Sequence, residues 1–196
     1  MQPLTRADIL TADAYERERE PLRRRLMVLK ERRRAPVGDE CSVHFENRDT
    51  IRYQIHEMLR VERSWDRPGA VEAELEAYNP LIPAPGELSA TVMFEYDAPE
   101  ARKQRLSDLV GIDRHLRLAV GDTAPLLAEF DRMQISEGRV SAVQFVKWRL
   151  DAHRQALLKR EGTVVRLIVD HPRYRAQSVL SEQTRKEIAA DLEARG

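Results

Sequence analysis

The chain has 196 residues, with 33 basic and 33 acidic side chains and a formal net charge of zero at pH 7. Because the charges balance, no overall field favours nucleic acid, a membrane surface or an acidic partner. The single cysteine, Cys41, excludes an internal disulfide and a thiolate metal cluster. The sequence has neither a run of about 18 apolar residues nor the order of a signal peptide, so we expect a soluble protein of the reducing cytoplasm.

The first 34 residues predict charge-rich helical structure. Pro21 is expected to kink this helix or to start a new one, because proline removes a backbone hydrogen bond and clashes with the preceding turn. Seven basic residues lie between residues 23 and 34, a density that could contact phosphates. Three glutamates lie just upstream, and no aromatic residue lies among the arginines to stack on bases. Nucleic-acid binding through this stretch is therefore a weaker alternative to a solvated or partner-facing helix.

Residues 41–46 alternate in polarity and predict a strand that leads directly into a helix. His44 and Glu46 share one face of this strand, opposite its apolar residues. They could converge on one ligand or metal, or they could belong to a polar face turned to water. Asn47 or Asp49 is expected to cap the helix, and the positive end of the helix dipole would lie beside Glu46.

The predicted helix carries polar groups where apolar ones are expected. Its apolar stripe consists of four residues: Ile51, Ile55, Met58 and Leu59. Glu62 falls near the middle of this stripe and Gln54 inside its edge. A buried carboxylate costs several kcal/mol unless it is paired or protonated, so Glu62 lies at an exposed helix end, forms an ion pair or belongs to a site. The opposite side is a basic ridge, which is typical of a solvated face: Arg52, His56, Arg60 and Arg63.

The remaining elements mix hairpins with crossovers. A helix from about residue 70 to 78 places Glu74 at the border of its apolar face. Strands are predicted at 88–96, 114–120, 126–130, 141–150 and 163–170, with helices starting near 97, 151 and 181. This order favours an α+β fold in which a mixed or largely antiparallel sheet of about six strands packs against helices. We expect one domain over residues 1–196, with a helical segment at 1–34 and a sheet-and-helix body at 41–196.

The signatures of the common enzyme classes are missing from the sequence. It contains no glycine-rich phosphate loop, no GxSxG elbow, no HExxH and no CxxC pair. Oxygen-rich side chains could instead form a site for iron, manganese or magnesium. The candidate ligand-binding residues are Glu46, Asn47, Arg48, Gln54, Glu57, Glu62 and Glu74. The candidate metal ligands are His44, Glu46, Glu57, Glu62 and His115.

Five segments of the chain are distinctive: FENRDTIRYQIHEMLR, EAYNPLIPAPGELSAT, LVGIDRHLRL, SAVQFVKWRL and VDHPRY. They resemble those of a bacterial family known only as a domain of unknown function (family three-five-zero-one). The resemblance spans nearly the whole chain but carries no activity, cofactor or catalytic residue. It implies a context, since such proteins are often encoded beside rubrerythrin-like diiron proteins and iron–sulphur oxidoreductases of the heterodisulfide-reductase type. A protein of either kind is then the implied partner, by association alone.

Two classes of function follow from these observations. The first is an accessory or interaction protein that serves a redox or oxidative-stress system, which rests on the missing motifs, the dense surface charge and the resemblance. The second is an enzyme or sensor that binds a metal or small ligand at the oxygen-rich site around residues 46–62. The second requires the candidate side chains to lie close together, because metal–oxygen bonds are only about 2 Å long.

Overall fold

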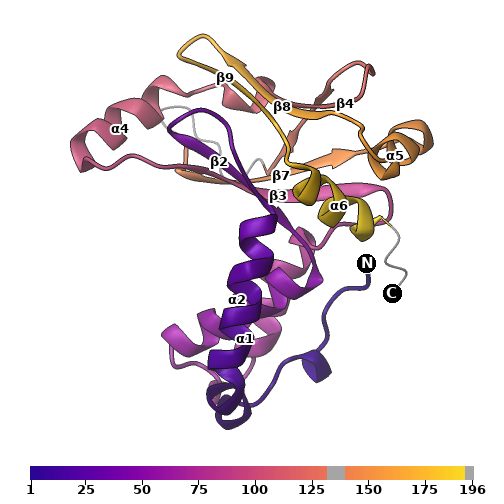
Figure 1. Cartoon of the computed structure of the whole chain (residues 1–196). Helices are drawn as coiled ribbons and strands as arrows, with labels where there is room; N and C mark the ends of the chain where they lie inside the picture. The colour runs from indigo at the N-terminus through magenta and orange to yellow at the C-terminus, as the bar shows by residue number, and fades with distance from the viewer. Residues whose placement is uncertain (132–139, 193–196) are drawn as a thin grey trace.

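The computed structural model describes residues 1–131 and 140–192, and in this part of the chain the strands form two antiparallel sheets (Figure 1). The first sheet contains, in spatial order, β1 (Arg34–Pro36), β2 (Cys41–Glu46), β3 (Glu87–Phe94), β7 (Val143–Arg149) and β6 (Glu129–Phe130). The second contains β5 (Leu126–Leu127), β4 (Leu116–Val120), β8 (Val165–His171) and β9 (Tyr174–Val179). The chain passes from the second sheet to the first between β5 and β6.

The main core lies between the two sheets. Alternation in the first sheet turns Phe45, Val92 and Trp148 inward, where they join a cluster that includes Leu118 and Leu167 of the second sheet. The rings of Phe45 and Trp148 lie 6.1 Å apart. Burying side chains of this size contributes about 1.5–3 kcal/mol each, so this interface is the main source of stability.

Three helices cover the other face of the first sheet and extend away from it: α1 (Ala12–Arg32), α2 (Arg48–Val61) and α3 (Ala70–Tyr78) (Figure 1). A second apolar cluster joins α2 and α3, with Ile51, Ile55 and Leu59 of α2 against Val71 and Leu75 of α3. The remaining helices are α4 (Pro99–Asp108), α5 (Ala152–Lys159) and α6 (Glu182–Asp191), and three short 3-10 turns are η1 (Arg6–Asp8), η2 (Asn79–Leu81) and η3 (Ile112–Arg114).

A buried ion pair ties α1 to α6. The guanidinium of Arg33, just after α1, is only 1% exposed and pairs with Asp191. It also donates to the backbone carbonyls of Phe45 and Glu46 at 2.9 and 3.1 Å. Because each donor group has a partner, the buried charge is compensated. One arginine thus fixes the end of α1, the end of β2 and the C-terminal helix relative to one another.

The predicted α+β fold is confirmed, and its strands divide between two sheets. Two strands, β1 and β9, were not predicted. Both lie at sheet edges; β1 has only three residues, and every second residue of β9 is exposed, so their apolar patterns are weak. The expectation that Pro21 could start a new helix is wrong, since α1 runs from Ala12 to Arg32 without a break. Tyr15 and Leu26 are buried on either side of Pro21, and their packing offsets the hydrogen bond that proline cannot donate.

Candidate functional site

A hollow of about 680 Å³ lies between the first sheet and the three helices that cover it, and we call it the sheet hollow. Its floor comes from three adjacent strands: His44 and Glu46 of β2, Thr91 and Met93 of β3, and Val143 and Phe145 of β7. Its walls come from α1, β1, α2, α3 and η2: Met27, Lys30, Glu31, Arg34, Thr50, Ile51, Gln54, Tyr78 and Leu81.

The side chains of the floor lie together because of strand alternation and strand register. His44 pairs with Thr91, and Thr91 pairs with Phe145, so these three side chains lie side by side on the outer face. All six floor residues are half-buried, whereas their sequence neighbours on the inner face are fully buried. The polar face of β2 is therefore covered by helices that leave space above it, and it is not turned to open water.

The carboxylate of Glu46 is held by two hydroxyl groups. Thr50 donates to Oε2 at 2.5 Å and Thr91 donates to Oε1 at 2.6 Å. Within the described part of the chain, Glu46 forms no ion pair with Lys, Arg or His. A carboxylate has about four lone-pair positions, so this one can accept further hydrogen bonds from a bound molecule.

His44 is oriented by a chain of polar groups. Its Nε2 lies 2.9 Å from Ser42 Oγ, which donates to Glu95 Oε2 at 3.1 Å. Because the single hydroxyl proton points to the charged carboxylate, Nε2 carries a proton, and Nδ1 keeps a lone pair that no described residue uses. Burial, and then the nearby charge of Arg34, lower the pKa of His44, so the ring is neutral at physiological pH.

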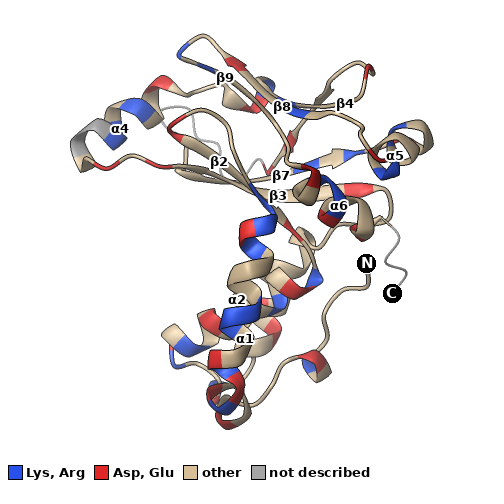
Figure 2. Cartoon of the chain, in the orientation of Figure 1, with Lys and Arg blue, Asp and Glu red and all other residues tan. Residues whose placement is uncertain are grey.

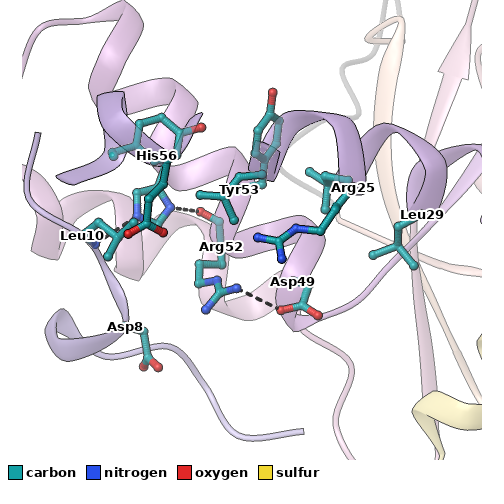
Figure 3. Close-up of a pocket in the computed structure, with 12 residues that line it drawn as sticks. Asp8, Leu10, Arg25, Leu29, Asp49, Arg52, Tyr53 and His56 are labelled. Carbon is teal, nitrogen blue, oxygen red and sulfur yellow. Dashed lines mark hydrogen bonds and ion pairs between the residues drawn. The ribbon is translucent and has the colours of Figure 1, made fainter. Parts of the chain in front are cut away.

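A second hollow, of about 400 Å³, lies between α1, α2 and the N-terminal segment, and we call it the N-terminal hollow (Figure 3). Here His56 uses both ring nitrogens, since Nδ1 donates to the Arg52 carbonyl at 2.7 Å and Nε2 accepts from the Leu10 amide at 3.0 Å. The ring also stacks on Tyr15 with centroids 4.6 Å apart. Arg52 pairs with Asp49 at 3.4 Å. These polar groups satisfy one another within the fold.

The predicted site residues separate into several places, and His44, Glu46 and Gln54 come together in the sheet hollow. Gln54 lines the hollow together with Tyr78. Asn47 is the N-cap of α2, as predicted, and accepts from the amides of Asp49 and Thr50 at 3.1 and 3.0 Å.

Two other predicted residues form ion pairs away from the sheet hollow. Arg48 pairs with Asp8 at 2.6 Å. Glu57 accepts two bonds from Arg19, at 2.8 and 2.9 Å, and one from the Tyr15 hydroxyl at 2.7 Å. The hydrogen bonds from Arg19 lower the pKa of Glu57 to about 2.

The last three candidates lie further out. Glu62 is the exposed C-cap of α2 and lies 3.7 Å from Arg67, which agrees with an exposed helix end. Burial, and then the charge of Glu62, raise the pKa of Glu74. His115 pairs with Asp170 at 2.9 Å on the second sheet. Among the described residues, no group of three or more His, Cys, Asp and Glu side chains could hold a metal ion.

One sequence expectation near this site is wrong. His56 belongs to a predicted solvated ridge, yet it is 3% exposed, because α2 packs against both α1 and α3. The residues that sequence reasoning missed are Thr50, Thr91, Tyr78 and Phe145. Alternation in 88–96 already placed Thr91 opposite the apolar face, but only the strand register shows that it lies beside His44.

The basic run of residues 23–34 is not a uniform basic surface. Its Arg33 is buried and paired with Asp191. Figure 2 shows acidic as well as basic residues along α1. Arg19 and Arg32 of this helix pair with Glu57 and Glu187. These ion pairs reduce the charge that α1 could offer to phosphates.

None of the helices in the described part of the chain is long and apolar enough to span a membrane. No curated protein matches the sequence. A crystal structure described as a novel protein of unknown function from Burkholderia pseudomallei K96243 is similar, with 36% identity and a TM-score of 0.90. The match covers 97% of this chain and 100% of that one. The family model described as "Protein of unknown function (DUF3501)" matches residues 3–192, so the chain belongs to the DUF3501 family.

Proposed function

We propose that this protein binds a small organic molecule in the sheet hollow. The observation that carries the proposal is that two polar residues of its largely apolar lining, Glu46 and His44, keep acceptor positions that no described residue uses. Ligand sites typically combine an apolar lining with a few converging polar groups, in a volume of about 300–1,000 Å³.

The lining divides into a polar and an apolar part. His44, Glu46 and Thr91 provide the polar part, and Met93, Val143 and Phe145 continue the floor as the apolar part. A ligand with a hydrogen-bonding head and an apolar body would match both. The N-terminal hollow offers a poorer match, because His56 already uses both nitrogens and Arg52 is paired with Asp49.

A neutral apolar dye, N-phenyl-1-naphthylamine, tests this proposal by fluorescence titration. We expect saturable binding of one dye molecule per chain. The Val143→Trp variant fills the floor of the sheet hollow and should abolish the signal. Leu22→Trp is the matched control, because Leu22 lines the N-terminal hollow, and it should bind as the wild type does. Equal binding by both variants, or no saturable binding by the wild type, would contradict the proposal.

The redox partner implied by the family resemblance stays a prediction. A ligand-binding protein can serve a redox system as an accessory, so the two ideas are compatible. Co-purification at endogenous expression tests the partner separately, by recovery of a rubrerythrin-like protein or an iron–sulphur oxidoreductase.

A further inference from the structure

The charges around the sheet hollow indicate which head group a ligand would carry. We infer that the hollow takes a molecule with a protonated amine head and an apolar body, with Glu46 as the counter-ion of the amine. This inference rests on the proposed function and specifies its ligand class.

Glu46 is the group that would contact the head. Its two hydroxyl partners, Thr50 and Thr91, come from different elements, so they fix the carboxylate without neutralising it. Thr50 is 1% exposed and cannot turn away easily. A half-buried carboxylate without a cation has a strong electrostatic preference for a positive partner.

Three basic residues beside the hollow or the Glu46 backbone have other partners. Arg33 donates to the backbone carbonyl of Glu46, but its charge is paired with Asp191. Arg34 pairs with Glu95 at 3.0 Å. The Nζ of Lys30 lies 5.8 Å from the centre of the Tyr53 ring, in a cation–π contact. None of these side chains forms an ion pair with Glu46 within the part of the chain that the structure describes.

His44, the titratable neighbour of Glu46 on the floor, is neutral and adds no positive charge. Burial and Arg34 both disfavour its protonated form. Its Nδ1 is an acceptor, and so is the Glu46 carboxylate. Because His44 and Glu46 both line the hollow, their acceptors match a head group that donates several hydrogen bonds, and an ammonium group donates three. An anionic head would instead meet the charge of Glu46.

The apolar body would lie over the rest of the floor. Phe145, Val143 and Met93 lead away from Thr91 along β7 and β3, and the Tyr78 ring lines the hollow from α3. Burying a hydrocarbon chain there is favourable in proportion to the apolar surface that it removes from water. The same hydrocarbon body can therefore be given different head groups without changing this part of the interaction.

Displacement of bound dye by three matched molecules tests the head group: 1-octylamine, 1-octanol and octanoate, at neutral pH. We expect the amine to displace the dye at a concentration at least roughly tenfold below that of the alcohol, with octanoate the weakest. Glu46→Gln should remove the advantage of the amine while the alcohol is unaffected. Glu18→Gln, which removes an exposed carboxylate of the N-terminal hollow, is the control and should keep the advantage.

Two results would overturn the amine head and leave the proposed function standing. In the first, octylamine and octanol displace the dye equally; in the second, the advantage of the amine survives in Glu46→Gln. A failure of all three molecules to displace the dye would also reject the inference. If Glu46→Gln does not fold, Thr91→Val keeps the carboxylate, removes one of the hydroxyl groups that fix it, and should reduce the advantage of the amine. Failure of the dye itself to bind would reject the proposed function.

Discussion

Each of the two hollows is lined by a histidine that has a glutamate close to it in the sequence, and the two histidine–glutamate pairs are in opposite states. On the N-terminal side, His56 uses both ring nitrogens, and the neighbouring Glu57 accepts from Arg19 and Tyr15. In the sheet hollow, His44 keeps one nitrogen free and Glu46 has hydroxyl partners but no ion pair among the described residues. Saturated polar groups stabilise a fold, whereas open ones are available to a ligand.

The difference arises from the elements that surround each pair. His56 and Glu57 lie on α2 where it packs against α1 and the N-terminal segment, so partners approach from several sides. His44 and Glu46 lie on a strand whose outer face is only partly covered. The comparison predicts that substitutions on the N-terminal side lower stability, and that equivalent substitutions in the sheet hollow affect binding.

The largest expected effect on stability is that of His56→Ala. It removes a stacked buried ring and leaves the Leu10 amide without its acceptor, so we expect a loss of about 2–4 kcal/mol in the free energy of unfolding. His44→Ala should cost less than about 1 kcal/mol, because the ring borders open space. Urea denaturation of both variants measures the difference. Equal losses would remove the distinction between the two hollows.

The second contrast is between the two glutamates. Glu57→Gln should lower the free energy of unfolding by about 1–3 kcal/mol, because it removes a charge-assisted pair with Arg19. Glu46→Gln should change it by less than about 1 kcal/mol, since an amide oxygen can still accept from a threonine hydroxyl. The same urea measurements apply. A larger loss for Glu46→Gln would make that carboxylate a structural group.

A third effect is the pH dependence that Glu57 causes. Its pKa is lowered from 4.5 to about 2, chiefly by the hydrogen bonds from Arg19, so the ionised form is favoured in the folded state. The resulting stability is fully present above pH 4.5 and is lost as the pH falls towards 2. Thermal unfolding of the wild type should therefore show a steeper loss over this range than that of Glu57→Gln. Parallel curves would contradict the assigned ion pair.

The smallest effect concerns the protons of the two histidines. Both pKa values are lowered by burial, and both rings should be neutral at pH 7. Their tautomers should differ, with the proton on Nε2 in His44 and on Nδ1 in His56. Long-range ¹H–¹⁵N correlation spectra distinguish the two forms. The same tautomer in both rings would contradict the hydrogen-bond chain through Ser42.

The sequence predicted the parts of the site that depend on local spacing. Alternation placed His44 and Glu46 on one face, and the N-cap rule identified Asn47. It did not predict what covers that face, because the positions of α1 and α3 over the sheet depend on contacts between residues distant in the chain. His56 was misjudged for the same reason, since its partners Leu10 and Tyr15 come from the N-terminal segment and α1.

Glu62 shows the limit of a helical projection. The 100° spacing placed it within the apolar stripe, but the helix ends at Val61, so Glu62 leaves the stripe as an exposed cap. The helical projection also gave no partner for Glu57, because that partner, Arg19, lies on a different helix. Side-chain partners of this kind are set by packing between elements, which the spacing of one element does not contain.

The most direct test of the central claim is a crystal structure of the protein with 1-octylamine. Our account predicts one molecule in the sheet hollow, with its nitrogen within hydrogen-bond distance, about 3 Å, of the Glu46 carboxylate and its chain over Val143 and Phe145. A molecule bound in the N-terminal hollow, or an amine turned away from Glu46, would contradict it.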